Sequence, residues 1–242
     1  MSQTLLALDG IAKRYGGQPV IDGLGFEVGA GEALGIIGPN GAGKTTLFNI
    51  IAGDVRPDAG SVRFAGREVT GQGPAALCRA GIGRTYQIPH PFAGMTVFEN
   101  VLVGATCGAG LNEAAAHAVA QRCLRRTGLL RQANTLAGAL PLLDRKRLEL
   151  ARALATGPKL LLLDEIAGGL TEHEVRELID IVREIRAEGV TLIWIEHIVH
   201  ALMAVVDRLI AISVGRLLTQ GRPEEVMASP QVREVYMGVE AA

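Results

Sequence analysis

The chain has 242 residues, 48% of them hydrophobic, and its 24 lysines and arginines are balanced by 25 acidic residues. This length favours one large α/β domain with a sizeable core, and makes a second full domain unexpected. The balanced charge excludes a strongly basic field, so we expect neither nucleic-acid binding nor direct attachment to an anionic membrane.

The start of the chain and its cysteines indicate a cytosolic protein. Residues 1–6 carry no positive segment ahead of a long apolar run, so no secretory signal is expected. No apolar stretch approaches the ~20 residues that span a bilayer. The three cysteines, Cys78, Cys107 and Cys123, lack the spacing of metal ligands. We expect reduced thiols.

Short apolar segments separated by glycines open the chain. Thr4–Leu8, Val20–Ile21 and Phe26–Val28 have the length and composition of short antiparallel strands at one edge of a sheet. Tyr15 lies between them, and from the residues alone it can be an ordinary core side chain or a platform for a ligand ring.

Residues 38–45 follow the pattern G-x-x-x-x-G-K-[ST], which binds nucleotide phosphates. The apolar run 33–37 before it predicts a buried strand, and residues 46–51 after it predict the first turns of a helix. Glycines let backbone N–H groups curl around phosphates, Lys44 adds a full positive charge, and Thr45 can ligate Mg²⁺. The predicted phosphate-binding residues are Gly38, Pro39, Asn40, Gly41, Ala42, Gly43, Lys44, Thr45 and Thr46.

Residues 89–158 contain helical patterns and no convincing strand, which predicts a helical subdomain inserted into the sheet domain. The expected helices are Thr96–Val103, Asn112–Arg126 and Arg145–Thr156. A further helix is predicted from Thr171 to Glu188, where Thr171 and Glu174 form a capping box.

Three more apolar runs, Leu160–Leu163, Val190–Ile195 and Leu209–Val214, predict buried parallel strands beside 33–37. Ligands bind at the carboxyl ends of such strands. Asp164 there can hold Mg²⁺, Glu165 can polarise an attacking water, and His197 can sense the γ-phosphate. Taken alone, the two acids are more typical of a solvated loop, and His197 is more typical of a surface or satisfied core residue. Gln87 alone would be an ordinary loop residue.

In this order, Tyr15, the phosphate loop, Gln87, Asp164–Glu165 and His197 resemble the ATP-binding subunit of an ABC transporter over essentially the whole chain. The resemblance implies a P-loop NTPase with a RecA-like core (1–88 and 159–242), an antiparallel edge sheet and a helical subdomain (about 89–158). It implies ATP and Mg²⁺ as ligands, with Tyr15 stacking on adenine, Val20 packing beside it, and Thr45, Gln87 and Asp164 at the metal. The absence of a guanine-reading Asn-Lys-x-Asp sequence also favours adenine.

Several stretches look most like importers of branched-chain and related amino acids, namely 84–87, 95–101, 197–200, 207–208, 220–225 and 232–238. The resemblance implies permease subunits, a second ATPase and, indirectly, a substrate-binding protein as partners. It also implies a place on the inner face of the cell membrane, held there by the permeases. The transported substrate itself is set by other subunits.

One family sequence is altered. The Leu-Ser-Gly-Gly-Gln type signature, which binds the γ-phosphate held by the partner subunit, here reads Leu140-Pro141-Leu142-Leu143-Asp144. Proline offers neither hydroxyl nor N–H, leucine adds bulk, and aspartate brings negative charge. Losing a positioned transition-state donor costs ~10²–10³ in rate. We therefore expect this chain to pair with a related ATPase that carries a normal signature.

Two other function classes stay open. A non-transport ABC ATPase acting on ribosomes or DNA would commonly carry two cassettes, a coiled coil or basic segments, none of which occurs here. A nucleotide-dependent assembly module with little turnover fits the altered signature. Replacing Glu165 by glutamine distinguishes an ATP-hydrolysing transport subunit from such a module. The transport subunit would lose its activity, whereas a module that only binds nucleotide would keep it.

Overall fold

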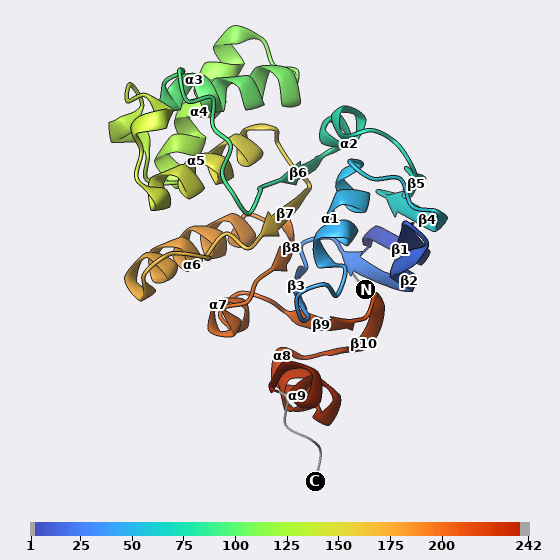
Figure 1. The fold of residues 1–242 in the computed structure, drawn as a ribbon. Coiled ribbons are helices and arrows are strands. Elements are labelled where there is room, and N and C mark those ends of the chain that lie inside the picture. Colours follow the sequence, from blue (N-terminus) through green and yellow to red (C-terminus); the bar gives the residue numbers. More distant parts are fainter. Residues whose placement is uncertain (1–2, 238–242) are drawn as a thin grey trace. The chain divides into compact units, whose positions relative to one another are not determined.

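A computed structural model describes residues 3–237 of the chain (Figure 1). Contacts divide the chain into two compact units, one formed by Met1–Pro74 with Thr191–Ala242 and the other by Ala75–Val190. The predicted subdomain, 89–158, falls within the second unit, and its bounds stay a prediction. Gly238, the last residue of the tail 232–238, lies outside the described residues.

The first unit contains two sheets. One is antiparallel in the order β2-β1-β4-β5, and the other has the order β10-β9-β3-β8 within this unit. Strand β3 is parallel to both β8 and β9, so the carboxyl ends of these three strands lie at one edge, as predicted. The elements are β1 Thr4–Tyr15, β2 Gln18–Gly29, β3 Ala33–Ile37, α1 Lys44–Ala52, β4 Ala59–Phe64, β5 Arg67–Glu68, β8 Thr191–Ile195, α7 Val199–Met203, β9 Arg208–Ser213, β10 Arg216–Gly221, α8 Pro223–Ala228 and α9 Pro230–Met237.

The predicted short strands at the start of the chain are wrong in length. Two strands of 12 residues each, β1 and β2, replace the three short segments, and the pairing shifts register at several points. Gly10 and Gly23 have positive φ within these strands. Glycines can adopt that conformation without steric cost, so here they mark irregularities inside a strand and not its end.

The second unit contains the parallel pair β6–β7 and most of the helices. The predicted helices are confirmed to within a few residues. The elements are α2 Pro74–Ala80, β6 Ile82–Arg84, α3 Val97–Val103, a π-helix Gly104–Gly108, α4 Glu113–Arg126, α5 Leu142–Ala155, β7 Leu160–Asp164 and α6 Glu172–Ala187, with 3₁₀ turns at Leu130–Gln132 and Ala137–Ala139.

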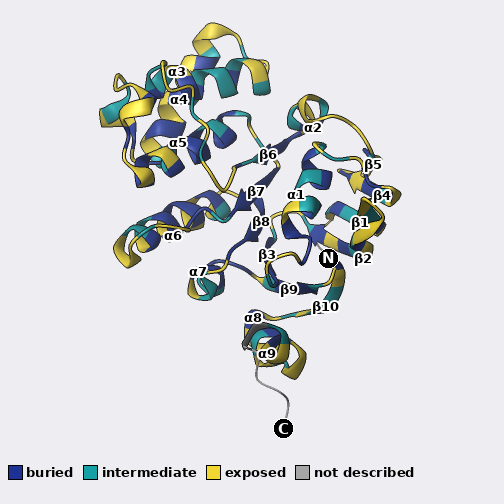
Figure 2. Cartoon of the chain, in the orientation of Figure 1, coloured by how far each residue is buried: buried dark blue, intermediate teal, exposed yellow. Residues whose placement is uncertain are grey.

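Helix α6 shows how the sequence sets local structure. Thr171 and Glu174 form the predicted capping box, in which each side chain accepts from the other residue's backbone N–H. Buried side chains follow at helical spacing (Val175, Leu178, Ile179, Val182 and Ile185), so the helix buries one face and exposes the other (Figure 2). Among the described helices, none combines the length and apolar character that a membrane crossing requires.

Candidate nucleotide-binding site

The phosphate loop follows the fully buried strand β3 and leads into α1. Two of its glycines are required by their surroundings. A Cβ on Gly38 would lie 2.3 Å from the carbonyl oxygen of Ile212, and one on Gly43, whose φ is +95°, would lie 2.6 Å from that of Val20. The loop is therefore packed against β9 and β2, which fixes the direction of its backbone N–H groups.

Lys44 is buried, with 6% of its surface exposed. Its ammonium group donates to the carbonyl oxygens of Gly38, at 2.7 Å, and Pro39, at 3.1 Å. The lysine thus spans the loop from the inside, while Thr45 next to it is exposed. A positive charge held inside a cradle of backbone amides suits a phosphate chain.

The remaining predicted residues of the first unit lie at the end of β1, on β2 and just beyond β8. Tyr15 ends β1 and is 46% exposed, so it is not an ordinary core residue, and the Lys13 ammonium lies 5.5 Å from its ring centre. Val20 is half-buried on β2. His197 is exposed just beyond β8, which pairs with β3 up to Ile195.

The turn Val214–Gly215, which follows the carboxyl end of β9 where the sequence predicts ligand binding, also touches the loop. The backbone N–H of Gly215 donates to the carbonyl of Ala42, and that of Asp22 donates to the carbonyl of Gly215. Val214 is 79% exposed at a φ of +48°, a rare conformation for a β-branched residue. The turn ties the phosphate loop to β2.

The second unit brings Gln87, Asp164 and Glu165 together. Asp164 is buried at the end of β7, and its backbone N–H donates to the Thr85 hydroxyl at 3.2 Å. Glu165 follows at a φ of +45°, and the Gln87 side-chain amide donates to its Oε2 at 2.5 Å. A non-glycine residue held in this strained conformation is typical of functional sites.

Two cations beside these acids were missed by sequence reasoning. Arg84 pairs with the Asp164 carboxylate at 3.0 Å, and the Lys146 ammonium donates to the backbone carbonyl of Glu165 at 3.4 Å. Lys146 is 4% exposed on α5. The only signal in the sequence was the position of Arg84, three residues before Gln87.

The altered signature region forms the start of α5, which begins at Leu142 and not at the predicted Arg145. Pro141 occupies the N-cap position without a side-chain hydrogen bond. The Asp144 carboxylate accepts from Gln132 at 2.8 Å and from Arg147 at 3.3 Å. These donors offset the negative charge that the sequence placed here, while the exposed Leu142 leaves an apolar surface at the helix start.

A family model described as ABC transporter matches residues 21–168. The chain belongs to the ABC transporter family. A model described as branched-chain amino acid ATP-binding cassette transporter matches residues 216–242 of this ABC protein. The chain is 37% identical to the high-affinity branched-chain amino acid transport ATP-binding protein LivG of Salmonella typhimurium, covering 98% of this chain and 99% of the relative. BraF of Pseudomonas aeruginosa, named for the same transport role, is 35% identical over the same shares.

Solved structures agree. A nucleotide-free ATP-binding cassette from an ABC transporter superposes with a TM-score of 0.88 at 31% identity, covering 98% of this chain and 100% of the other. The ADP conformation of the cassette MJ1267 gives the same four values. These likenesses confirm the predicted α/β P-loop NTPase fold, and this ABC protein is an ATPase of the transporter class.

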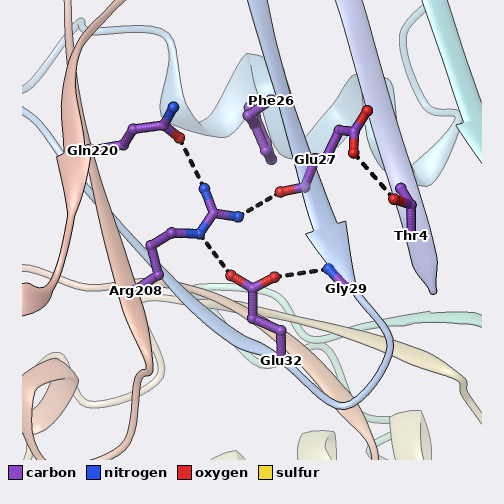
Figure 3. Close-up of a pocket in the computed structure, with 7 residues that line it drawn as sticks. All are labelled: Thr4, Phe26, Glu27, Gly29, Glu32, Arg208 and Gln220. Carbon is purple, nitrogen blue, oxygen red and sulfur yellow. Dashed lines mark hydrogen bonds and ion pairs between the residues drawn. The ribbon is translucent and has the colours of Figure 1, made fainter. Parts of the chain in front are cut away.

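A separate polar pocket of about 480 Å³ in the first unit surrounds Arg208 (Figure 3). The guanidinium donates to Glu32 at 2.7 Å, to the Gln220 side chain at 2.8 Å and to the backbone carbonyl of Glu27. Glu32 in turn accepts from the Gly29 N–H at 2.7 Å. Because these bonds join β2, β9 and β10, we interpret this pocket as a structural element that holds the three strands together.

Proposed function

We propose that this chain is the ATP-hydrolysing subunit of an importer for branched-chain or related amino acids, working as one half of an ATPase dimer. The observation that carries the proposal is the likeness to LivG along 98% of the chain. The match of residues 216–242 to a branched-chain amino acid model supports the same substrate class from the C-terminal segment.

The buried Lys44 and the packed phosphate loop support the proposed phosphate-binding roles, and the resemblance to ABC ATPases suggests the adenine contacts. Loop N–H groups and Lys44 bind the phosphates, Tyr15 stacks on adenine, and Val20 packs beside it. Thr45, Gln87 and Asp164 would hold Mg²⁺. This donor set fits the ion, which prefers oxygen ligands and keeps waters and phosphate oxygens in its sphere. Gln87 uses its N–H on Glu165, which leaves the amide oxygen as the ligand atom.

Described residues contain no group of three or more His, Cys, Asp or Glu placed to hold a metal ion. That finding is compatible with the proposed ligands, because only Asp164 among them is acidic. When bound, Mg²⁺ neutralises charge on the β- and γ-phosphates.

In the proposed hydrolysis reaction, Glu165, Gln87 and His197 have different roles. Glu165 orients a water and accepts its proton as the oxygen attacks the γ-phosphorus, while the bond from phosphorus to the β,γ-bridging oxygen breaks and ADP leaves; the Gln87 hydrogen bond fixes the carboxylate. The imidazole of His197 contacts the γ-phosphate and reports whether it is present. ATP binding closes two subunits and hydrolysis reopens them, which alternates the attached permeases between two access states.

The proposed partners are transmembrane permease subunits, a second ABC ATPase and, through the permeases, a substrate-binding protein. A heterodimer is favoured over a homodimer because Pro141 and Leu142 replace the phosphate-binding residues of the signature. The protein would then act in the cytoplasm, at the inner face of the membrane.

Transport of labelled leucine tests the proposal. The chain is expressed with the permeases, second ATPase and binding protein encoded beside it, and uptake into vesicles is measured with ATP. Uptake should require this chain and stop with Glu165→Gln, whereas the control Glu172→Gln, whose side chain is 92% exposed, should transport normally. A complete neighbouring gene set without permeases would contradict the importer function.

A second candidate is a nucleotide-dependent assembly module with little turnover, which the altered signature favours. In that case Glu165→Gln would bind ATP and keep full biological activity. Complementation of a deletion strain by this variant distinguishes the two functions.

A further inference from the structure

Arg84 forms an ion pair with the proposed metal ligand Asp164, and neither the phosphate loop nor the hydrolytic roles account for it. We propose that Arg84 is a resident counter-ion for Asp164, and that bound Mg²⁺ would take over this carboxylate and release the Arg84 guanidinium from it. The proposal rests on the magnesium site of the proposed function.

The pair is buried and fixed in place by the sheet. Nη2 of Arg84 lies 3.0 Å from Oδ2 of Asp164, and the two side chains are 7% and 5% exposed. Arg84 is the last residue of β6 and pairs with Leu162 of β7, two residues before Asp164. A carboxylate buried this deeply is costly without a neighbouring positive charge, and the guanidinium supplies one.

The same segment holds both acids. Between Arg84 and Gln87 lies Thr85, fully buried, whose N–H donates to the carbonyl of Leu162 at 2.9 Å. Gln87 then donates to Glu165. The proposed metal ligand and the proposed base are therefore both held by residues 84–87.

Arg84 also connects the acid to an exposed apolar stretch. The centre of its guanidinium lies 4.9 Å from the ring centre of Tyr86, a cation–π distance. Tyr86 is 44% exposed, and Ile88 beyond it is 68% exposed. A change in the position of the guanidinium would therefore alter its contact with the Tyr86 ring and the environment of the residues that follow.

Electrostatics sets the direction of the coupling. Mg²⁺ and guanidinium are both positive, so they repel when they share one carboxylate in a poorly screened site. Mg²⁺ carries the larger charge and binds phosphate oxygens as well, so the ion prevails when nucleotide is present. Arg84 accordingly lowers the affinity for Mg²⁺ and stabilises the metal-free protein.

The test compares Arg84→Met, which keeps the unbranched apolar stem but removes the guanidinium and its charge, with Arg84→Lys and with the control Arg79→Met on the exposed surface of α2. Thermal unfolding of the full chain is followed with ADP at rising Mg²⁺. Without metal, Arg84→Met should unfold at a lower temperature than wild type. Its half-saturating Mg²⁺ concentration should be about tenfold lower. Arg84→Lys and Arg79→Met should behave as wild type.

Hydrogen exchange of residues 85–92 provides the second measurement. Adding Mg²⁺ to the ADP complex should change exchange there more in wild type than in Arg84→Met, or than in Arg84→Gln if the methionine variant does not fold, because only wild type releases a guanidinium from Asp164. An equal or higher half-saturating Mg²⁺ concentration in the uncharged variants would overturn the role of Arg84. If wild type with ADP shows no response to Mg²⁺ at all, the proposed magnesium site falls too.

Discussion

Lys44 illustrates how a single side chain can serve both folding and binding. The lysine is buried, and its charge is offset by the carbonyl dipoles of Gly38 and Pro39. A buried ammonium group without such partners would be strongly unfavourable. The two hydrogen bonds therefore hold the charge where the phosphates are expected.

Lys44→Ala should weaken ATP binding by about ten- to a hundredfold, because hydrogen bonds to charged groups are worth ~1.5–3 kcal/mol each. Fluorescent nucleotide titration measures the affinity. Lys159→Ala, which removes an exposed lysine, is the matched control and should bind as wild type. Similar affinities for both variants would rule out the assigned role.

Glu149 predicts a pH dependence of stability. Burial raises the pKa of its carboxyl above the ordinary 4.5, although Arg152, 3.1 Å away, acts in the opposite direction. The folded chain thus holds this proton more tightly than the unfolded chain. The resulting stability is fully present below pH 4.5 and is lost as pH rises through the raised pKa.

Glu149→Gln has no such proton to lose, so the free energy of unfolding of wild type should fall relative to this variant between pH 4.5 and 7. Urea denaturation across that range measures it. Glu174→Gln is the control of opposite sign, because hydrogen bonds from Thr171 lower the pKa of Glu174. Parallel pH profiles of wild type and Glu149→Gln would contradict the burial argument.

At the scale of elements, the sequence predicts the end of a helix or strand correctly where local residues determine it. It fails where pairing within the sheet or close packing determines it. Strand β3 ends where predicted because its five residues are all buried and a glycine-rich loop follows. The full length of β1 differs from the prediction because a glycine such as Gly10 usually interrupts a strand, whereas this sheet accommodates it as an irregularity. The π-helix at Gly104–Gly108 was missed because close packing sets it, with a Cβ on Gly104 reaching 2.6 Å from the carbonyl of Arg152.

Arg208→Met should lower the free energy of unfolding by about 2 kcal/mol, because three acceptors on β2, on β10 and before β3 lose their donor. Nucleotide affinity should not change, because Arg208 starts β9 and the phosphate loop meets the other end, at Ile212. Arg216→Met is the control, and its exposed pair with Asp22 should cost less than ~1 kcal/mol. Weakened ATP binding by Arg208→Met would show that this pocket contributes to nucleotide binding as well as holding the strands together.

At the scale of the whole molecule, the candidate site could be predicted only in part. Lys44, Asp164 and Glu165 follow from local sequence, because Lys44 completes the phosphate-loop pattern after β3 and the two acids lie at the end of the apolar strand β7. Arg84 could not be found that way, since its partner Asp164 is 80 residues distant and only strand pairing brings them together. From the sequence, Asp144 brings negative charge towards a phosphate, and its donors Gln132 and Arg147 are visible only in the fold.

The last prediction concerns the signature segment. Restoring it with Pro141→Ser, Leu142→Gly, Leu143→Gly and Asp144→Gln should raise ATP hydrolysis by the isolated chain by about a hundredfold, because each subunit would then offer its mate positioned phosphate donors. Phosphate release measures the rate, and size-exclusion chromatography with ATP detects homodimers of Glu165→Gln carrying the same changes. Asp144→Gln alone is the control and should stay slow, since Pro141 and Leu142 still lack donors. Vigorous hydrolysis by the unaltered chain on its own would contradict the proposed need for a second kind of ATPase subunit.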